Sequence, residues 1–459
     1  MADSGTARNA APHDDIDPTR VAAARALATA LRRAAPQSSR PQLSSKENDN
    51  FVEDFMGASR LHFIGSWKAR FSELLDAQPP APPLPTTDRL TERVIMHIDL
   101  DCFFASVASL HRPELSGLPV AVSWSGSTKG SAEIASANYR ARRDGVKNGM
   151  WVPRATELCP HLVIMPYEFD RYEVVAEAMY KAVFDVTPHV MGISCDECFA
   201  DVTGLPVDAE RLGEALRASI LRETGGCTAS VGIGPNRLLA RLATARAKPD
   251  GLLRLRAADA AELLRDEPVR TLPDCGHDRE EKLGAIGIAT CGDLVAADAS
   301  RLRKAVGPKV AEKLLAYARG GDPRPWEPRP ERKSVGAQAS WGVRFESDEG
   351  AEKFCRDLAR QVAERMRQGA AVKGRSLTLK LWRAMRDAPA GMSKGHLGHG
   401  LCDILNRSVA LPGAPTDDAD VLQREAVAVL RALAVPPAEV RGMGIQVTKL
   451  EAAGGGGGG

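Results

Sequence analysis

The sequence predicts a multidomain protein of the α/β (α+β) class. Its 459 residues correspond to several units of ordinary domain size, and 44% of them are hydrophobic, which is enough to build cores. Short apolar runs typical of strands also alternate with stretches at helical spacing. The first clear pair is the strand RVIMHIDLD (93–101), which continues into the helical stretch CFFASVASL (102–110).

The part before this strand is expected to hold a tail, a helical extension and a linker. Residues 1–50 are rich in Ala, Ser, Asp, Arg and Pro, which predicts a disordered tail with at most a short helix over Ala22–Ala34. Residues 51–93 are predicted to be a helical extension, with apolar side chains near helical spacing from Phe51 to Leu74, followed by the proline-rich linker QPPAPPLPTTD.

Strands and helices then follow one another through the middle of the chain. The patterns predict strands over 118–124 and 228–234, a strand hairpin over 190–204, and helices over 132–143, 171–185, 208–224 and 236–247. Residues 262–322 are helical, and their glycine turns AIGIATCGDL and AVGPKVAEKLL resemble helix–hairpin–helix turns. Exposed backbone N–H groups in such turns hold a DNA phosphate without reading its sequence.

The last unit, residues 329–450, alternates strands and helices. In RSLTLKLW (375–382), Leu377, Leu379 and Leu381 face one side of a strand, and GMGIQVTKL (442–450) is expected to be the final strand. The glycine run at the end of 451–459 is expected to be a linker or a truncation scar.

Charge and cysteine content limit the class of protein. The formal net charge is only +2, but residues 329–386 hold 14 Lys and Arg against 7 Asp and Glu, which is either a polyanion-binding surface or a solvated helix face. The nine cysteines are scattered, and there is no signal peptide and no apolar run of the roughly 18 residues that a membrane helix needs. These features predict free thiols in an intracellular, reducing compartment, with no membrane partner.

Carboxylates at strand ends are the candidates for chemistry. Asp99 and Asp101 lie two apart at the end of an apolar strand, so both point to one face if the strand persists. Asp196 and Glu197 are adjacent in the hairpin, and a turn or twist is needed to bring both to one site. Three converging carboxylates suit two Mg²⁺ ions, which activate a primer 3′-hydroxyl and stabilise the leaving pyrophosphate. The alternative is that they are acidic turn residues.

Two further patterns allow a different metal. CDEC (195–198) matches the Cys-x₂-Cys spacing of zinc sites, although the chain has no second such pair. GHLGHGLC (395–402) offers His396, His399 and Cys402 at ligand-like spacing, although its glycines favour a surface loop.

Cations on the predicted helix 132–143 and just after the predicted helix 236–247 are candidates for binding phosphate. Tyr139 and Arg142 are three apart on SANYRARR, hence on one helix face, and a guanidinium grips phosphate oxygens in pairs. Lys248 in ARAKPDG ends a predicted helix and acts as a point charge. Taken singly, each is equally consistent with a surface cation.

Six motifs together resemble the Y family of translesion DNA polymerases. In chain order they are HIDLDCFFASV, SANYRAR, GVKNGM, SCDECFADVTG, SVGIGPNRLLARLATARAKPDG and KLGAIGIATCGDL. The resemblance spans about residues 94–450 and implies a right-handed arrangement of palm (94–116 and 185–261), fingers (117–184), thumb (262–328) and little finger (329–450). It also implies binding of primer–template DNA, two Mg²⁺ ions with Mn²⁺ as an alternative, and a role in the nucleus.

The resemblance assigns roles to single residues. Asp99, Asp196 and Glu197 match the catalytic metal ligands, with the Leu100 carbonyl as a further ligand, and Phe104 matches the steric gate beneath the deoxyribose. The nucleotide site includes Asp99, Leu100, Asp101, Cys102, Phe103, Phe104, Ser136, Tyr139, Arg142, Asn148, Asp196 and Lys248. The matching DNA-contacting stretches are Gly276, His277, Asp278 and Arg279, and Arg332, Lys333, Ser334, Val335, Gly336, Ala337, Gln338, Ala339 and Ser340.

Within the family, SRLHFIGSWKARF, PYEFDRY, ERKSVGA and GHGLCD resemble the deoxycytidyl transferases of eukaryotic translesion synthesis. This implies that Arg60 pairs with incoming dCTP and that Leu61 takes the place of the evicted template guanine. Met443 and Gly444 match a little-finger loop that holds this guanine. The proposed pairing has a physical basis, because cytosine offers two adjacent acceptors to the parallel donors of a guanidinium, whereas thymine and guanine present an N–H there.

Some features depart from the pattern. Asp274 stands where a glycine is expected at the entrance to the thumb hairpin. No BRCT-like module and no polymerase-recruiting domain is visible, so a catalytic core is expected, and binding of other translesion polymerases is not assumed. The alternatives are a Y-family polymerase that reads the template base and a non-catalytic scaffold that only binds primer–template DNA.

Overall fold

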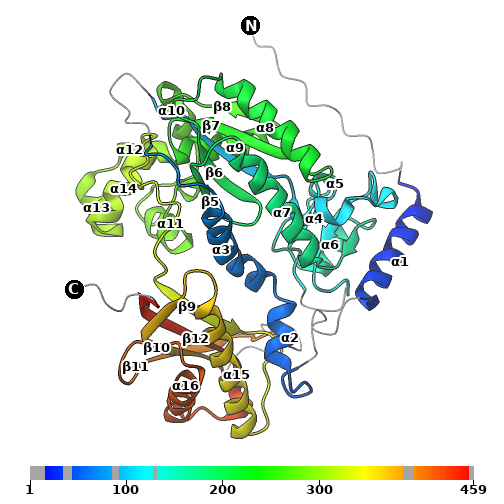
Figure 1. The fold of residues 1–459 in the computed structure, drawn as a ribbon, viewed down its shortest axis with the longest axis vertical. Coiled ribbons are helices and arrows are strands. Elements are labelled where there is room, and N and C mark those ends of the chain that lie inside the picture. Colours follow the sequence, from blue (N-terminus) through cyan, green and yellow to red (C-terminus); the bar gives the residue numbers. More distant parts are fainter. Residues whose placement is uncertain (1–15, 35–43, 85–91, 128–131, 386–396, 454–459) are drawn as a thin grey trace. The chain divides into compact units, whose positions relative to one another are not determined.

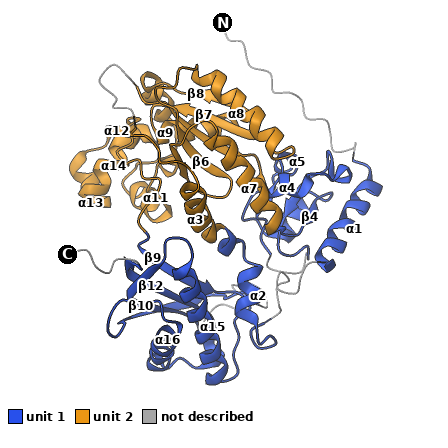
Figure 2. Ribbon diagram, in the orientation of Figure 1, with its two compact units in different colours: residues 1–63, 104–168, 332–459 blue, residues 64–103, 169–331 orange. Residues whose placement is uncertain are grey.

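The computed structural model describes residues 16–34, 44–84, 92–127, 132–385 and 397–453 (Figure 1). The chain divides into two compact units (Figure 2). Unit 1 comprises residues 1–63, 104–168 and 332–459, and unit 2 comprises residues 64–103 and 169–331. None of the described helices has the length and apolarity of a membrane span, and all nine cysteines are free thiols. The glycine run 454–459 lies outside the described residues.

Unit 1 contains a small three-stranded sheet. The apolar strand β2 (Val120–Val122) pairs in parallel with β4 (Val163–Met165) and antiparallel with β3 (Ser136–Ala137). The helices of this region are α4 (Phe103–Ser109), α5 (Tyr139–Arg143) and α6 (Val152–Leu158).

The predicted helix over 132–143 is wrong in its first half. Ser136 and Ala137 pair with β2, and only α5 is helical. Asn138 explains the boundary, because its side-chain oxygen accepts the N–H of Ala141 at 3.0 Å while its amide donates to the carbonyl of Leu118 at 2.9 Å. Such an Asn ends extended backbone and caps the helix that follows.

The short helix expected over Ala22–Ala34 is present as α1 (Pro18–Ala34), which begins four residues earlier and is not part of a disordered tail. Val21, Ala24 and Ala28 are buried. Its arginines bind backbone carbonyls of the small sheet region: Arg25 donates to Pro160 at 2.6 Å, and Arg32 donates to Ile164 at 2.8 Å. The apolar stripe and these hydrogen bonds stabilise the docked helix, and composition alone did not indicate this stabilisation.

The C-terminal part of unit 1 is a four-stranded antiparallel sheet with two long helices. The strand order is β11-β10-β12-β9, with bounds β9 (Ser334–Ala339), β10 (Val372–Ala384), β11 (Cys402–Ala410) and β12 (Val440–Ala452). Leu377, Leu379 and Leu381 are all fully buried on one face of β10, which confirms the predicted alternation. The helices that pack on this sheet are α15 (Asp348–Arg367) and α16 (Ala419–Leu433).

The extension contributes to this same core through α2 (Phe51–Gly57). Phe51, Val52 and Met56 are buried in it, and the Phe51 ring lies 5.9 Å from that of Phe354 on α15. Helix α2 ends at Gly57, and the next helix, α3 (Arg60–Asp76), begins after two non-helical residues. The sequence prediction of a helical extension is therefore confirmed, with one interruption.

Unit 2 is built on a five-stranded sheet in the order β5-β6-β1-β7-β8. Its strands are β1 (Ile95–Leu100), β5 (Val190–Gly192), β6 (Glu197–Asp201), β7 (Ala229–Gly234) and β8 (Leu252–Arg254). Helices α7 (Phe169–Phe184), α8 (Ala209–Glu223) and α9 (Arg237–Ala247) accompany it. Because α7 packs against α8, unit 2 takes in the last part of the predicted fingers.

A helical subdomain completes unit 2. It consists of α10 (Ala260–Arg265), α11 (His277–Gly284), α12 (Cys291–Ala296), α13 (Ala299–Val306) and α14 (Pro308–Ala318) around one apolar core. The turns at Gly287 and Gly307 have φ of 79° and 85°, a conformation that favours glycine, and both positions face open space. Asp274 also has a positive φ of 63°, which explains the expectation of a glycine there.

The apolar face of α3 packs in unit 2, as its spacing predicts. Trp67 and Phe71 are 3% and 5% exposed, and their rings lie 5.6 and 5.2 Å from the ring of Tyr180 on α7. The contact is close, since a Cβ added at Gly192 on β5 would lie 2.8 Å from the Phe71 ring.

Phe71→Ala is therefore expected to destabilise unit 2 by about 3–5 kcal/mol, the usual cost of emptying a buried aromatic site. The measurement is chemical denaturation followed by intrinsic fluorescence. Lys68→Ala, an exposed position on the same helix, is the control. Equal effects of the two variants would show that the helix is not held by this face.

Candidate active site

The register of strands β1 and β6 brings the predicted carboxylates together. On β1, Asp99 lies directly opposite Glu197 of β6. Directly opposite residues of an antiparallel pair project to the same face, so these two side chains emerge as neighbours. Asp196 precedes β6, and its carbonyl accepts the N–H of Leu100 at 2.9 Å. The alternation of a regular strand therefore does not separate Asp196 from Glu197.

The three carboxylates share one electrostatic environment. Burial raises the pKa of Asp99 to about 6, with the charges of Asp196 and Glu197 adding to the rise and Lys248 opposing it. Burial also raises the pKa of Asp196. Burial acts in the same direction on Glu197, but its hydrogen bond to His97 and the nearby cations hold its pKa below the ordinary value. Concentrated negative charge of this kind favours binding of a cation.

Protein donors hold these oxygens in place. Lys248, which was predicted to bind phosphate, lies with its Nζ 2.5 Å from Asp99 Oδ1. His97 Nε2 lies 2.7 Å from Glu197 Oε1, while its Nδ1 lies 2.8 Å from Thr244 Oγ1 on α9. Ser194 donates to Asp196.

The donor set fits a hard divalent cation. Three carboxylates and a nearby backbone carbonyl, that of Leu100, are oxygen ligands of the type that such ions prefer. Among the described residues, no group of three or more His, Cys, Asp or Glu side chains is already arranged around one point. Lys248 and His97 now satisfy carboxylate oxygens that a bound metal would take over.

Asp101 has a distinct role. It is 2% exposed and accepts hydrogen bonds from Thr228 Oγ1 at 2.9 Å, Ser230 Oγ at 2.8 Å and the backbone N–H of Asp250 at 2.8 Å. Strand β1 ends at Leu100, before this residue. Asp101 therefore fastens the segment after Lys248 to the strand that carries Asp99.

The two alternative metal patterns have little support in the geometry. Burial raises the pKa of the Cys195 and Cys198 thiols, which keeps them protonated, whereas zinc binds the thiolate. The His399 Nδ1 and the Cys402 thiol are both bonded to backbone carbonyls, those of Gly400 and His399. His396 lies outside the described residues.

Among the predicted nucleotide-binding residues of unit 1, Arg60 is adjacent to Ser136. Its Nη1 donates to the carbonyl of Ala135 at 3.3 Å. Leu61, by contrast, is 70% exposed. The first turn of α3 therefore places Arg60 beside Ser136 and leaves Leu61 in solvent.

Aromatic rings fix the predicted steric gate. The Phe104 ring is 6% exposed and meets Phe63 of α3 edge-on at 6.3 Å and Tyr167 edge-on at 6.2 Å. Burial raises the pKa of Tyr167 to about 12, with Arg60 opposing the rise, so its hydroxyl stays protonated. The neighbouring Phe103 is directed elsewhere, since it is 3% exposed and its ring lies 5.8 Å from that of Tyr172.

The predicted triphosphate contacts are preorganised on α5. The Arg142 guanidinium lies 4.9 Å from the centre of the Tyr139 ring, and its Nε donates to the carbonyl of Ala137 at 2.8 Å. The two side chains share one helix face, as their spacing predicts. Ser136 is 6% exposed, whereas Asn148 is exposed in the turn before Gly149.

The two predicted DNA-contacting stretches differ in what they expose. Gly276 caps α11, and Gly276, His277 and Asp278 are exposed while Arg279 is half-buried. In Arg332–Ser340, strand alternation divides the residues: Val335, Ala337 and Ala339 are buried, and Lys333, Ser334 and Gln338 are exposed. The exposed side chains of this stretch are available to a ligand, and the buried ones could contribute only backbone groups.

The final strand expected over 442–450 is confirmed as β12, and the loop that the resemblance implied at Met443 and Gly444 is wrong. Both residues lie inside β12, opposite Ala339 and Gln338 of β9 and opposite Leu381 and Lys380 of β10. The Met443 side chain is fully buried in the core. A residue paired on both sides in a central strand does not form a binding loop.

Sequence reasoning missed several contributors to the site. Tyr167 was included in the motif PYEFDRY, but nothing in the pattern marked it as a neighbour of the steric gate. His97 had a usable signal, because it lies two residues before Asp99 and thus on the same strand face. Thr244 had none, since its contact depends on how α9 packs on β1.

The raised pKa of Asp99 predicts a pH effect on stability. The folded value, about 6, lies above the ordinary 3.8, so the folded state binds more protons between these values. The free energy of unfolding should therefore fall as pH rises from about 4 to about 6 and should not change further above that range because of this group. Asp99→Asn is expected to reduce this slope in metal-free denaturation curves, and an unchanged slope would exclude Asp99 as its source.

Comparison with known families covers most of the chain. The impB/mucB/samB family matches residues 98–245, its C-terminal domain matches residues 332–458, and the thumb domain of DNA polymerase iota matches residues 270–322. The solved Y-family DNA polymerase chimera Dbh-Dpo4(243-245)-Dbh superimposes with a TM-score of 0.64 at 24% identity, over 78% of this chain and 99% of the chimera.

Full-sequence relatives agree with these matches. The chain is 42% identical to DNA repair protein REV1 of Arabidopsis thaliana and 33% identical to Rev1 of Drosophila melanogaster, over 91% and 88% of its length. It spans 38% and 46% of those two proteins. DNA polymerase IV of Desulfatibacillum aliphaticivorans is 33% identical over 79% of this chain and 86% of the relative. The chain therefore belongs to the Y family of DNA polymerases, with REV1 proteins among its relatives.

Proposed function

We propose that this chain performs translesion DNA synthesis as a deoxycytidyl transferase, adding dCMP from dCTP to a primer opposite template G, damaged G or an abasic site. The observation that carries this proposal is the first turn of α3. It puts a fork-shaped cation, Arg60, beside the Ser136 region and an exposed apolar side chain, Leu61, next to it. The REV1 relatives support the same reading.

Arg60 supplies the base-specific contact. Cytosine O2 and N3 accept the two parallel donors of a guanidinium, whereas thymine and guanine set an N–H against one of them. An unpaired buried donor costs about 1–3 kcal/mol, which corresponds to a preference of roughly fivefold to 150-fold. The protein, rather than the template base, thereby specifies the nucleotide.

Leu61 acts as the wedge that replaces the template base. Moving a base out of the stack costs a few kcal/mol. An apolar side chain of which 70% is exposed in the unbound protein offsets part of that cost by filling the space beside the primer terminus. Such a site accepts an abasic gap or a bulky guanine adduct.

Phe104 and α5 recognise the rest of the nucleotide. The edge-on packing of Phe104 against Phe63 and Tyr167 fixes the ring that excludes a 2′-hydroxyl. Arg142, stacked on Tyr139, binds phosphate oxygens.

We assign the carboxylates as the ligands of a divalent metal, with two Mg²⁺ ions as the expected occupants. Asp99, Asp196, Glu197 and the Leu100 carbonyl would hold the ions, which would supply activation of the primer hydroxyl and stabilisation of pyrophosphate. Lys248 would then bind the triphosphate in place of Asp99. His97 keeps Glu197 oriented, and Asp101 holds the Lys248 segment.

The surrounding regions bind primer–template DNA. We assign residues 94–116 and 185–261 as palm, 117–184 as fingers, 262–328 as thumb and 329–450 as little finger. The exposed turns at Gly287 and Gly307 offer backbone donors to phosphate, and Lys333 and Gln338 are exposed beside β9. A nuclear location follows from the eukaryotic DNA repair relatives.

The proposal predicts the outcome of single-nucleotide incorporation opposite G, A, T, C and an abasic site. The wild-type chain should insert dC in every case, and Arg60→Ala should lose this preference while its affinity for primer–template stays unchanged. Arg154→Ala, which removes an exposed arginine of unit 1 that pairs with Glu157, is the control. Insertion of the complementary nucleotide opposite A, T and C would instead identify a template-reading Y-family polymerase.

A second prediction concerns the carboxylates. Asp196→Ala combined with Glu197→Ala should abolish transfer, because it removes two of the three carboxylates that hold the metal and takes from His97 its Glu197 partner. Binding of primer–template, measured by fluorescence anisotropy, should persist. Residual transfer near the wild-type rate would refute the metal assignment and would leave a scaffold role open.

A further inference from the structure

One arginine of the C-terminal part of unit 1 connects three separate elements. Arg365, in the last turn of α15, donates through Nη1 to the carbonyl of Gly336 on β9 at 2.5 Å. Its Nη2 contacts Met56 Sδ of α2 at 3.2 Å and also donates to Nδ1 of His62. A single guanidinium therefore joins β9, α2 and the first turn of α3.

His62 is held as an acceptor. A guanidinium only donates, so Nδ1 must carry the lone pair in this contact and the ring must be neutral. Burial, and then the charge of Arg365, hold the pKa of His62 down to about 4, in agreement with a neutral ring at physiological pH. His62 follows directly after the exposed Leu61, one residue further from Arg60.

The Arg365 contact is a costly one. Burial lowers the pKa of this guanidinium to about 10, its Nε is buried without a hydrogen-bond partner, and no carboxylate forms a salt bridge with it among the described residues. A half-buried cation that is near the Glu364 carboxylate but makes no salt bridge contributes little to stability. Its two donor nitrogens, in contrast, fix the positions of Gly336 and His62 relative to each other.

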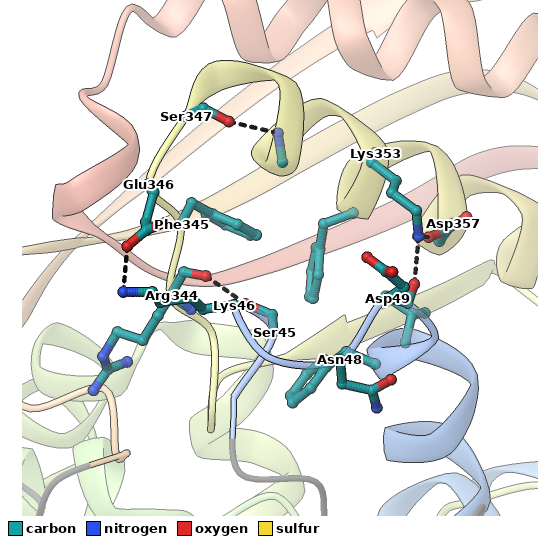
Figure 3. A pocket seen from close by; sticks show the side chains of 14 residues that line it. Ser45, Lys46, Asn48, Asp49, Arg344, Phe345, Glu346, Ser347, Lys353 and Asp357 are labelled. Atoms are coloured by element: carbon teal, nitrogen blue, oxygen red, sulfur yellow. Dashed lines mark hydrogen bonds and ion pairs between the residues drawn. The ribbon is translucent and has the colours of Figure 1, made fainter.

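The chain before α2 is fastened to the same region. Ser45 Oγ donates to the carbonyl of Arg344 at 2.7 Å and accepts the N–H of Arg344 at 2.8 Å. Lys353 of α15 donates to the carbonyl of Asp49 (Figure 3). These contacts surround a small cavity whose lining includes none of the predicted site residues. Phe51 and Val52 are buried next to this cavity, so the segment that leads into α3 is held at several points.

We propose that Arg365 and His62 are positioning residues that orient the first turn of α3, so that the Arg60 fork and the Leu61 side chain are set for nucleotide selection. This inference rests on the proposed function of Arg60 and Leu61. It makes the nucleotide preference of the enzyme depend on a residue in α15 that contacts neither nucleotide nor DNA bases.

The test uses two substitutions of His62. Asn offers an amide oxygen close to the position of Nδ1, whereas Leu has a similar volume and no acceptor. The KM for dCTP, kcat and the preference for dC are measured opposite an abasic site. His62→Asn should behave like the wild type, and His62→Leu should raise the KM for dCTP and lower the dC preference by about fivefold or more, the minimum for a buried donor left unpaired.

Controls separate positioning from folding. Arg360→Gln alters an exposed arginine of the same helix and should change neither value. Arg365→Lys keeps the charge but cannot serve both Gly336 and His62, and it should reproduce the His62→Leu effect with an unchanged primer–template Kd. Equal losses in His62→Asn and His62→Leu, or wild-type kinetics in His62→Leu and Arg365→Lys, would overturn the inference.

The Arg60→Ala background distinguishes the two proposals. If Arg60 is the pairing residue, adding His62→Leu to Arg60→Ala should cause no further loss of dC preference, because the two act through one contact. Retention of dC preference by Arg60→Ala alone would refute the proposed function. Loss in Arg60→Ala with no effect of His62→Leu would refute only the positioning role.

Discussion

The pairing of Asp99 with Glu197 across β1 and β6 is the constraint on which the carboxylate site depends. A slip of one residue in this register would turn the β1 side chains to the opposite face and separate Asp99 from Glu197. The register is held from both sides, since β1 also pairs with β7 and Asp101 binds Thr228 and Ser230. Strong pairing is needed because burial and the mutual repulsion of the carboxylates both act against the charged state.

The carboxylates and the pair Arg60 and Leu61 stand on structural elements of different rigidity. The carboxylates stand on strands at the centre of a sheet, the most rigid type of scaffold for a site. Arg60 and Leu61 stand on the first turn of a helix, where intrahelical hydrogen bonds are incomplete. Tertiary contacts must therefore supply the rigidity, and His62, Phe63 and the buried face of α2 provide them.

The carboxylates of the site and the strand β10 could be predicted from the sequence, because short local patterns mark them. DLD and SCDE mark carboxylates at strand ends, and the alternation of Leu377, Leu379 and Leu381 identifies β10. The errors arose where a non-local contact decided the outcome. Asn138 stopped a helix by bonding to Leu118. Arg365 and His62 are 303 residues apart, so no pattern in the chain could connect them.

The docking of α1 has a consequence for sequence divergence. Arg20, Arg25 and Arg32 bind main-chain carbonyls, those of Ser116, Pro160, Leu162, Ile164 and Ser123, and not side chains. Every residue type presents the same carbonyl, so these hydrogen bonds survive a change of side chain at the residues that accept them. Sequence divergence beneath α1 is therefore limited by the packing of Val21, Ala24 and Ala28 and by the backbone path, and not by the arginine contacts.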